Sequence, residues 1–251
     1  MIKKYFKKKL FKFLSKYDYK LYKTNYNQIL KKIVNKHNPV IFDVGANQGQ
    51  SIEFFSKLYH KPIIHSFEPV SSCYELIKTK YQNEKNIFIN NLALGDRKQL
   101  KKIYVTPKTQ NSSFYPININ SKWFKDRSQK QKLSHKDFKN IENVKVETID
   151  NYFKNSNLNK IDLLKIDTQG YEAMILKGAK KTIKEKKILA ISCEIIFDDT
   201  YNKNLSFYEI EKHLLDGNFR LVALNFSEPN LFQGIKFDAN ALYVKHELID
   251  F

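Results

Sequence analysis

The sequence predicts an α/β protein with a mostly parallel sheet and helices on both of its faces. Apolar, β-branched runs alternate along the 251 residues with stretches of helical periodicity, and this alternation is typical of repeated strand-helix-strand units. The first apolar run, residues 40–44, contains Asp43 and is followed at once by a short glycine loop. Such a strand-to-helix turn is a common place for a bound ligand in these folds.

The expected elements follow from the period of the apolar residues. Val40, Ile41, Phe42 and Val44 form a near-continuous apolar run, as expected of a strand that is buried on both faces. Similar runs predict strands near 62–67, 86–91, 161–166, 187–194, 219–225 and 239–245. Apolar residues spaced three or four apart predict helices near 50–59, 70–81, 172–184 and 205–217.

The glycine loop after the first strand favours a ligand with a cationic centre. Gly45 and Gly49 allow positive φ and a close approach of the backbone. Their Gly-x-x-x-Gly spacing differs from the Gly-x-Gly-x-x-Gly of pyrophosphate sites, and Asp43 adds a negative charge. Glu68 ends the next strand, where an acid accepts hydrogen bonds from two ribose hydroxyls. Together these features predict a nucleoside joined to a zwitterionic amino acid.

In this order and spacing, the motifs resemble the FkbM-type S-adenosylmethionine-dependent methyltransferase family. The matching segments, spread over roughly residues 38–246, are Asp43-Val-Gly-Ala-Asn-Gln-Gly49, Phe67-Glu-Pro69, Asn91-Leu-Ala-Leu-Gly-Asp96, Val146-Glu-Thr-Ile-Asp150, Asp162-Leu-Leu-Lys-Ile-Asp-Thr-Gln-Gly-Tyr-Glu172 and Leu176-Lys-Gly-Ala179. The resemblance implies a class I Rossmann-like methyltransferase fold with a seven-stranded, mostly parallel sheet, helices on both faces and an antiparallel last strand. It also implies methyl transfer from S-adenosyl-L-methionine to a hydroxyl of a sugar or other small metabolite.

The same resemblance places the cofactor-binding residues in three connections. They are Asp43, Gly45, Ala46, Asn47 and Gly49 after the first strand, Glu68 and Pro69 after the second, and Ala93 and Leu94 after the third. The backbone around the last two is expected to line the adenine ring. A simple turn at Gly95-Asp96 is the alternative for this third segment.

Asp167 is the first candidate for the chemistry. Methyl transfer to an alcohol requires alignment of the acceptor oxygen and removal of its proton. Asp167 stands at the tip of the 161–166 strand and could act as a base, orient the hydroxyl or hold a divalent metal ion. The structural alternative is that it caps the following helix. The family usually has glutamate where this chain has Gln169, whose amide can neither take a proton nor supply negative charge.

Two further residues are catalytic candidates. Glu194 ends the fifth predicted strand and could pair with Asp167 across the cleft, or alternatively with a lysine. His135 could serve as a general base near neutral pH, although a loop histidine of this kind often faces solvent. No Cys/His spacing indicates zinc, and the sequence assigns no metal ligands.

The chain divides into a basic helical N-terminal extension, residues 1–37, and a methyltransferase domain, residues 38–251. The domain contains an insert near 107–142 that lacks strong periodicity and holds the single tryptophan, Trp123. Long connections without regular structure are often functional, so the insert is interpreted as a substrate-recognition segment. A loop without catalytic importance is the alternative.

Positive charge is concentrated in the N-terminal extension. The formal net charge is +18, and residues 1–36 hold twelve lysines and a single acid, Asp18. Apolar residues such as Phe6 and Phe13 recur at helical spacing between the lysines of residues 1–20, a pattern that fits peripheral contact with an anionic membrane. A helix that caps the domain or covers the acceptor cleft is the alternative. With three arginines among 44 basic residues, nucleic acid is not expected as a partner.

The two cysteines, Cys73 and Cys193, are expected to be free structural thiols, which favours a cytoplasmic location, with any membrane contact at the inner face. The function predicted is O-methylation of a hydroxyl on a saccharide, sugar nucleotide or lipid-linked glycan. Two alternatives remain: a natural-product small-molecule O-methyltransferase, and a non-catalytic cofactor-binding protein at the membrane. The sequence predicts neither the acceptor nor the oligomeric state.

Overall fold

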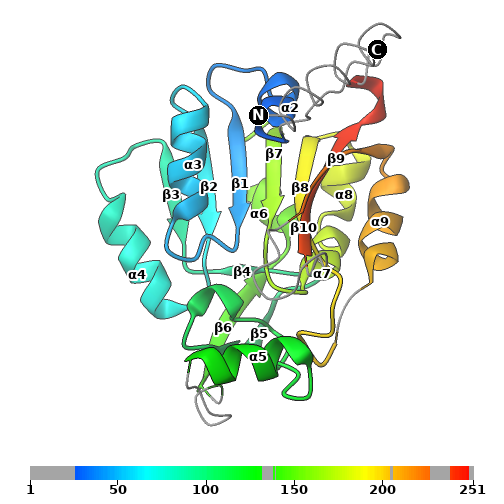
Figure 1. Ribbon diagram of the computed structural model, residues 1–251. Coiled ribbons are helices and arrows are strands. Elements are labelled where there is room, and N and C mark those ends of the chain that lie inside the picture. Colours follow the sequence, from blue (N-terminus) through cyan, green and yellow to red (C-terminus); the bar gives the residue numbers. More distant parts are fainter. Residues whose placement is uncertain (1–25, 132–137, 139, 204–205, 227–237, 249–251) are drawn as a thin grey trace, which may run out of the picture.

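The computed structural model describes residues 26–131, 138, 140–203, 206–226 and 238–248 (Figure 1). The strands are β1 (Val40–Val44), β2 (Ile63–Phe67), β3 (Ile87–Asn90), β4 (Ala93–Leu94), β5 (Gln99–Val105), β6 (Asn140–Glu147), β7 (Ile161–Ile166), β8 (Ile188–Ile196), β9 (Phe219–Phe226) and β10 (Asp238–Lys245). The helices are α2 (Tyr26–Ile33), α3 (Gln50–Leu58), α4 (Ser71–Lys80), α5 (Lys122–Gln131), α6 (Ile149–Asn155), α7 (Glu172–Lys177), α8 (Lys180–Lys184) and α9 (Phe207–Leu215), with short 3-10 turns at Thr109–Asn111 and His246–Leu248.

The main sheet has seven strands in the order β3-β2-β1-β7-β8-β10-β9. Strands β3, β2, β1, β7 and β8 are parallel, and β10 is antiparallel to both β8 and β9. The class I Rossmann-like prediction, including the antiparallel last strand, is confirmed. The strand order reverses between β1 and β7, and open α/β sheets bind ligands at the carboxyl ends of the strands beside such a switch point.

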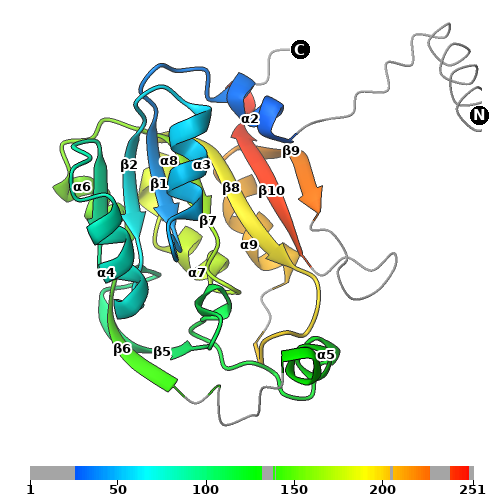
Figure 2. The same ribbon diagram turned by 60° about the vertical axis from the view of Figure 1, so that its left-hand side comes forward.

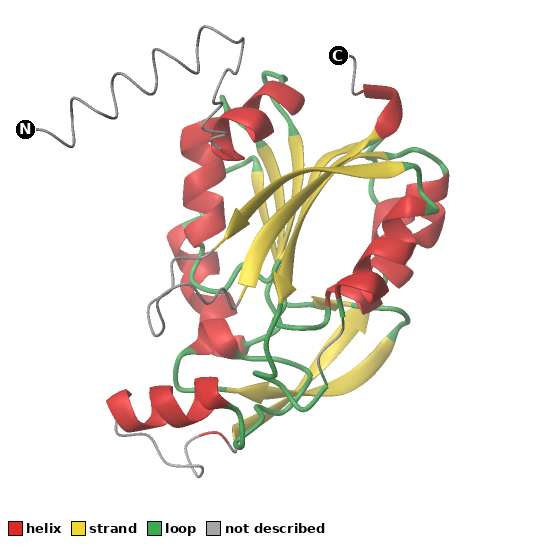
Figure 3. Cartoon of the chain, turned by 45° about the vertical axis from the view of Figure 1, so that its right-hand side comes forward, coloured by secondary structure: helices red, strands yellow, loops and turns green. Residues whose placement is uncertain are grey.

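Helices cover both faces of this sheet (Figure 3). Leu30 of α2 and Ile52 of α3 pack against Ile41, Leu163 and Leu242 on one face. On the other face, residues of α6 to α9 pack against alternate positions of the same strands, including Phe42, Leu164, Ile191 and Tyr243. Burial on both faces explains why the strands are nearly continuous apolar runs.

A second sheet, in the order β4-β6-β5, lies with α5 beyond the carboxyl ends of the parallel strands (Figures 1 and 2). The sequence did not predict β5 or β6, because their apolar residues do not all face the core: Leu100 and Ile141 are exposed, and the strands are otherwise rich in charged and polar residues. The insert near 107–142 was expected to lack regular structure. That expectation is wrong in part, since the segment contains a 3-10 turn, α5 and the first residues of β6.

The predicted helix 172–184 is two helices, α7 and α8, separated at Gly178. A Cβ on Gly178 would lie 1.9 Å from the carbonyl oxygen of Gly95, so the chain can approach the small sheet here only with glycine. The other predicted helices and the main-sheet strands agree with the structure to within a few residues. Cys73 and Cys193 are buried free thiols. Across the described ranges, no helix is both long enough and apolar enough to cross a bilayer.

Candidate active site

A cavity of about 610 Å³ opens at the carboxyl ends of the strands, beside the switch point between β1 and β7. One half of it is bounded by the loops after β1 and β2 and by β4. The other half is bounded by α2, the insert and the ends of β8, β9 and β10. The lining residues whose polar or ionisable side chains could bind a ligand or take part in a reaction include Asn47, Glu68, Lys165, Asp167, Gln169, Ser192, Glu194, Asn225, Asp238 and Asn240.

The turn after β1 is shaped by its closeness to β7. Gly45 has φ +83°, and a Cβ at this position would lie 1.9 Å from the carbonyl oxygen of Asp167. The two strands meet there because the Asp167 amide donates to the carbonyl of Val44 over 3.0 Å. Ala46 and Asn47 then line the cavity, and Asn47 also has positive φ. Gly49 does not line the cavity within the described structure and precedes α3 instead.

Glu68 lies beneath this turn and is only 4% exposed. Its two carboxylate oxygens accept hydrogen bonds from the backbone amides of Asn47 (2.7 Å) and Val70 (2.8 Å). Burial raises the pKa of Glu68 to about 7 against the opposite effect of these amides. Each oxygen keeps a further lone pair, so the side chain can still accept hydroxyl donors from the cavity, which it lines together with Pro69.

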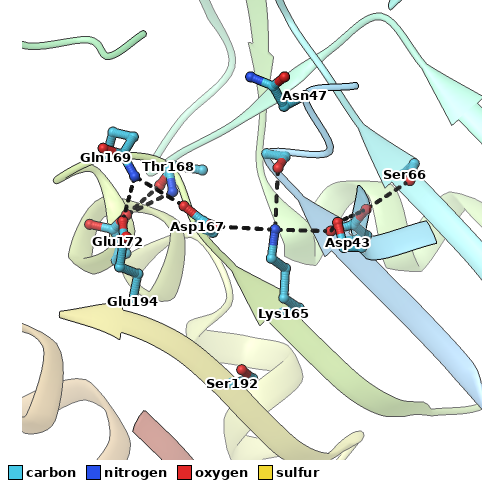
Figure 4. Close-up of polar contacts among 12 residues, drawn as sticks. Asp43, Asn47, Ser66, Lys165, Asp167, Thr168, Gln169, Glu172, Ser192 and Glu194 are labelled. Atoms are coloured by element: carbon cyan, nitrogen blue, oxygen red, sulfur yellow. Dashed lines mark hydrogen bonds and ion pairs between the residues drawn. The ribbon is translucent and has the colours of Figure 1, made fainter. Parts of the chain in front are cut away.

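Asp43 lies deeper than the sequence suggested. It is fully buried and does not line the cavity within the described structure. Its carboxylate accepts from Ser51 (2.9 Å) and Ser66 (3.2 Å) and forms an ion pair with Lys165 (3.2 Å). The lysine ammonium also contacts Asp167 at 3.5 Å, as Figure 4 shows. Asp43 therefore holds Lys165 in place rather than facing a ligand directly.

Lys165 keeps its charge in this position. Burial favours the neutral amine, but the facing carboxylates of Asp43 and Asp167 outweigh it and hold the pKa of Lys165 above its ordinary value. Its Nζ also donates to the carbonyl of Gly45 at 3.2 Å. Lys165 thus contacts the turn after β1 through Gly45, the buried acid Asp43 and the candidate catalytic acid Asp167.

Gln169 joins the two candidate catalytic carboxylates (Figure 4). Its side-chain nitrogen donates to Asp167 (3.1 Å) and to Glu194 (2.7 Å), and its side-chain oxygen accepts from the Tyr201 hydroxyl (2.8 Å). The backbone of Gln169 has φ +58°, and its backbone carbonyl accepts a hydrogen bond from the Ser113 hydroxyl of the insert (2.7 Å). Asp167 and Glu194 therefore do come together, through an amide that the sequence analysis treated only as a departure from the family.

The capping alternative for Asp167 is wrong. Asp167 does not cap α7, which begins at Glu172, and the Glu172 carboxylate accepts from the backbone amides of Thr168 (2.8 Å) and Gly170 (3.2 Å). The charge of Glu194 adds to those of Asp43 and Asp167 in raising the pKa of Lys165, so the lysine-paired alternative for Glu194 stays open. Burial, followed by the charge of Asp167, raises the pKa of Glu194 well above its ordinary value.

The second half of the cavity is lined by a polar row that crosses the sheet. Glu194 of β8 pairs in register with Asn240 of β10, which pairs with Asn225 of β9. Directly opposed residues project from the same face of a sheet, and all three line the cavity. The face that is apolar under α2 thus becomes polar at the carboxyl end of β8.

α2 and the insert close this half of the cavity. Tyr26 of α2 lines it and shares a 2.6 Å hydrogen bond with Ser192, and burial raises the pKa of Tyr26 to about 12. The insert contributes Thr109, Gln110, Asn111, Ser112, Phe114 and Trp123. His135 lies outside the described residues, as does the whole of the 1–20 segment. Both interpretations of the 1–20 segment, membrane contact and a covering helix, therefore stay predictions.

Several lining residues were missed by the sequence analysis. Tyr26 follows a lysine-rich segment without a recognisable motif, and Asn225, Asp238 and Asn240 belong to strands whose pairing partners are distant in the chain. A polar residue that interrupts an apolar strand, such as Asn225 or Asn240, was the available signal. As to metals, the described residues contain no group of three or more His, Cys, Asp and Glu that could hold an ion.

The first half of the cavity fits S-adenosylmethionine. Buried Glu68 offers free lone pairs where a ribose would lie, and Ala93 and Leu94 of β4 give a buried apolar wall for an adenine ring. Asn47 and the backbone of the Gly45 turn border the same space. The acid-rich lining also suits the positive charge of a sulfonium. All the residues that the sequence assigned to the cofactor line the cavity except Asp43 and Gly49, and their contact with the cofactor stays a prediction.

Comparison with known proteins agrees with this site. The methyltransferase FkbM domain model matches residues 43–221. A 2-O-methyltransferase, NoeI, of Sinorhizobium fredii is 24% identical over 170 residues, which cover 62% of this chain and 64% of that protein, so the match spans less than two thirds of the relative.

Solved structures with a similar fold include the magnesium protoporphyrin IX methyltransferase of Synechocystis PCC 6803 with bound S-adenosylmethionine (TM-score 0.46, 7% identity, covering 88% of this chain and 79% of that one). Another is a methyltransferase of Aquifex aeolicus (TM-score 0.43, 11% identity, covering 86% and 88%). The domain match extends over most of the chain and includes every connection that lines the cofactor half of the cavity. The chain therefore belongs to the methyltransferase FkbM domain family.

Proposed function

We propose that the protein methylates a hydroxyl group of a saccharide. The observation that carries this proposal is the second half of the cavity, where the row Glu194, Asn240 and Asn225 lies beside Ser192 and the aromatic rings of the insert and α3. Side-chain amides and hydroxyls both donate and accept hydrogen bonds, as sugar hydroxyls do. The name of the S. fredii relative, a 2-O-methyltransferase, supports oxygen as the methylated atom.

Asp167 is the proposed base. It stands at the junction of the two halves of the cavity, and its side chain is 37% exposed, whereas Asp43 is fully buried. When bound, S-adenosylmethionine supplies an electrophilic methyl group. Asp167 then orients the acceptor hydroxyl and takes its proton, while Lys165 and Gln169 hold the carboxylate in place from two sides (3.5 Å and 3.1 Å).

A divalent ion at Asp167 finds less support in this geometry. Asp167 and Glu194 share the Gln169 side-chain nitrogen, a hydrogen-bond donor that would have to turn away before a metal ion could bind both carboxyl groups. The proposal therefore assigns the proton transfer to Asp167 without a metal partner.

The test is formation of S-adenosylhomocysteine with a panel of saccharide acceptors. The Asp167→Asn variant should keep the cofactor affinity of the wild type in calorimetry, because the Asp167 side chain is not among the residues assigned to the cofactor. Its turnover should fall by about 10²- to 10⁴-fold, the usual contribution of a general base. Turnover at the wild-type rate in this variant would remove Asp167 from the chemistry. Transfer to natural-product phenols or alcohols with no transfer to saccharides would favour the alternative small-molecule function.

A further inference from the structure

Two carboxyl groups of the cavity lining meet at a single amide nitrogen. The side-chain nitrogen of Gln169 donates to Asp167 over 3.1 Å and to Glu194 over 2.7 Å, so each carboxyl group takes one of its two hydrogens (Figure 4). The Tyr201 hydroxyl donates to the side-chain oxygen of the same amide over 2.8 Å, which keeps the nitrogen turned toward the acids. An amide carries no charge, so it brings the two carboxyl groups together without neutralising either.

The two carboxyl groups are also hydrogen-bonded to each other. Burial is the largest cause of the raised pKa of Glu194, the charge of Asp167 is the next, and a hydrogen bond between the two side chains adds to both. Carboxylate oxygens only accept hydrogen bonds, so two carboxyl groups can bond to each other only when one of them carries a proton. Two like charges this close would also repel each other, which favours a single shared proton.

Lys165 determines which of the two acids is ionised. Its ammonium lies 3.5 Å from the Asp167 carboxylate and 3.2 Å from that of Asp43. Burial lowers the pKa of Lys165, whereas Asp43 and Asp167 raise it, with a smaller contribution from Glu194. A neighbouring cation favours the ionised form of an acid, so Asp167 is the member of the pair that keeps its negative charge.

The other titratable groups around Glu194 favour its neutral form or are neutral themselves. Glu172 at the start of α7 and Asp238 at the start of β10 both raise the pKa of Glu194. Tyr201 and Cys193 are buried, and burial raises the pKa of each well above its ordinary value, so neither carries a charge near neutral pH. Glu194 is therefore the member of the pair that holds the proton.

We infer that Asp167 and Glu194 hold one proton between them, with Glu194 as the carboxylic acid that positions the Asp167 carboxylate for the reacting hydroxyl. The catalytic role rests on the proposed function, whereas the shared proton does not. Asp167 forms a new O–H bond with the acceptor's proton while the acceptor oxygen bonds to the methyl carbon, whose bond to sulfur breaks with its electron pair left on sulfur. The Glu194 proton is not consumed, and the pair is restored when Asp167 releases its proton to water.

An NMR titration of the full chain, labelled with carbon-13 at the carboxyl carbons of Asp and Glu, tests the shared proton without any acceptor. The signals of Asp167 and Glu194 are those lost in Asp167→Asn and Glu194→Gln. At neutral pH, Glu194 should have the chemical shift of an acid and Asp167 that of a carboxylate. In Asp167→Asn, the acid dissociation constant of Glu194 should rise at least about tenfold, because a like charge is removed. Glu75, exposed on α4, is the control signal that should not respond to this substitution.

The pH profile of methyl transfer, measured with an acceptor from the saccharide panel, tests the positioning role. Turnover should fall at high pH as Glu194 loses its proton, because the two carboxylates then repel each other and Asp167 is displaced. Glu194→Gln keeps a neutral donor, so it should lack this alkaline decline and turn over at least about tenfold faster at neutral pH than Glu194→Ala. Glu75→Gln makes the same exchange on the exposed surface of α4 and should leave both turnover and pH profile unchanged.

The outcomes separate this inference from the proposed function. A Glu194 signal that titrates together with the exposed glutamates would overturn the shared proton and support the lysine-paired alternative. Turnover in Glu194→Gln as low as in Glu194→Ala, or an alkaline decline that persists in Glu194→Gln, would overturn the positioning role. If no saccharide accepts a methyl group, the proposed function fails, and the NMR titration still decides whether the two acids share a proton. Should Glu194→Gln not fold, through-space contacts with the Gln169 side-chain amide identify the Glu194 signal instead.

Discussion

Lys165 and Asp43 occupy paired positions on neighbouring parallel strands, so their ion pair follows from the register of β7 and β1. Two donors, Ser51 and Ser66, complete the hydrogen bonds of the buried acid. A buried charge that loses its partner is left unpaired in a poorly solvated place, and this costs much more than the pair contributes in net stability.

Replacement of Lys165 should show that loss of one partner costs more stability than loss of both. Lys165→Met is expected to lower the free energy of unfolding by about 3–5 kcal/mol, because the buried Asp43 side chain loses its ion-pair partner. The double variant Asp43→Asn with Lys165→Met should recover most of that loss, since no charge is stranded. Urea denaturation of the wild type, both single variants and the double variant measures the coupling. A double variant no more stable than Lys165→Met would show that the two side chains act independently.

Glu68 should make cofactor binding depend on pH. Its pKa is raised to about 7 by burial, so the carboxyl is half protonated near neutrality. The ionised form is the better acceptor of ribose hydroxyls, and S-adenosylmethionine should therefore bind more weakly as the pH falls through about 7. Calorimetry from pH 6 to pH 8.5 checks this dependence, with Glu68→Gln as the matched control that cannot ionise.

Titration of the cofactor itself affects the wild type and Glu68→Gln equally, so it cancels in the ratio of their affinities. This ratio should rise with pH and level off above about pH 8, once Glu68 is fully ionised. Glu68→Ala, which removes both acceptor oxygens, should weaken binding by about 1.5–3 kcal/mol at the plateau. A ratio that stays constant over the whole range would mean that Glu68 does not contact the cofactor.

At the scale of elements, the sequence predicted the strands and helices that have a regular apolar pattern. It missed the elements whose pattern is weak or whose ends depend on contacts with distant residues. Strands such as β1 and β7 are buried on both faces and therefore carry a strong apolar signal. β5 and β6 are half exposed, with lysines such as Lys101 and Lys102, so their pattern is weak. The break between α7 and α8 depends on a backbone contact between Gly178 and Gly95, which are distant in the chain. Contacts of that kind leave no local pattern.

The same reasoning explains the prediction of the site. Glu68 and Asp167 lie at strand tips, and strand tips of a parallel sheet meet at one edge, so local patterns were enough to place them near the cavity. The bridging role of Gln169 depends on φ +58° and on Tyr201, which belongs to a different loop. The polar row on β8, β10 and β9 depends on strand order and register, and these cannot be read from one strand alone.

The contact between β1 and β7 gives a prediction about glycine. In Gly45→Ala, the new Cβ would lie 1.9 Å from the Asp167 carbonyl, and φ +83° is itself unfavourable for alanine. The variant should lose well over about 1 kcal/mol of stability. Gly170→Ala is the matched control, because it has φ +97° but its nearest neighbour would be 3.7 Å away. Equal urea midpoints for the two variants would show that the close approach carries no extra cost.

At the scale of the whole molecule, positive charge is concentrated in the N-terminal extension. Residues 1–36 carry twelve of the lysines. α2, the described part of this extension, lies against the cavity through Tyr26, Asn27 and Leu30. The extension therefore joins the described structure at Tyr26, a residue that lines the cavity.

Residues 1–20, which lie outside the described structure, are predicted to bind anionic membrane surfaces. The full chain should sediment with phosphatidylserine vesicles at low salt and be released as salt screens the attraction. Replacing Phe6 and Phe13 by Ser should weaken binding although every lysine is kept, because the apolar residues supply the insertion energy of an interfacial helix. Phe88→Ser, an exposed aromatic residue on β3, is the matched control. A chain lacking residues 1–20 that still binds the vesicles as well as the full chain would refute the prediction. Loss of folding on truncation, with no vesicle binding by the full chain, would instead favour a helix that covers the domain.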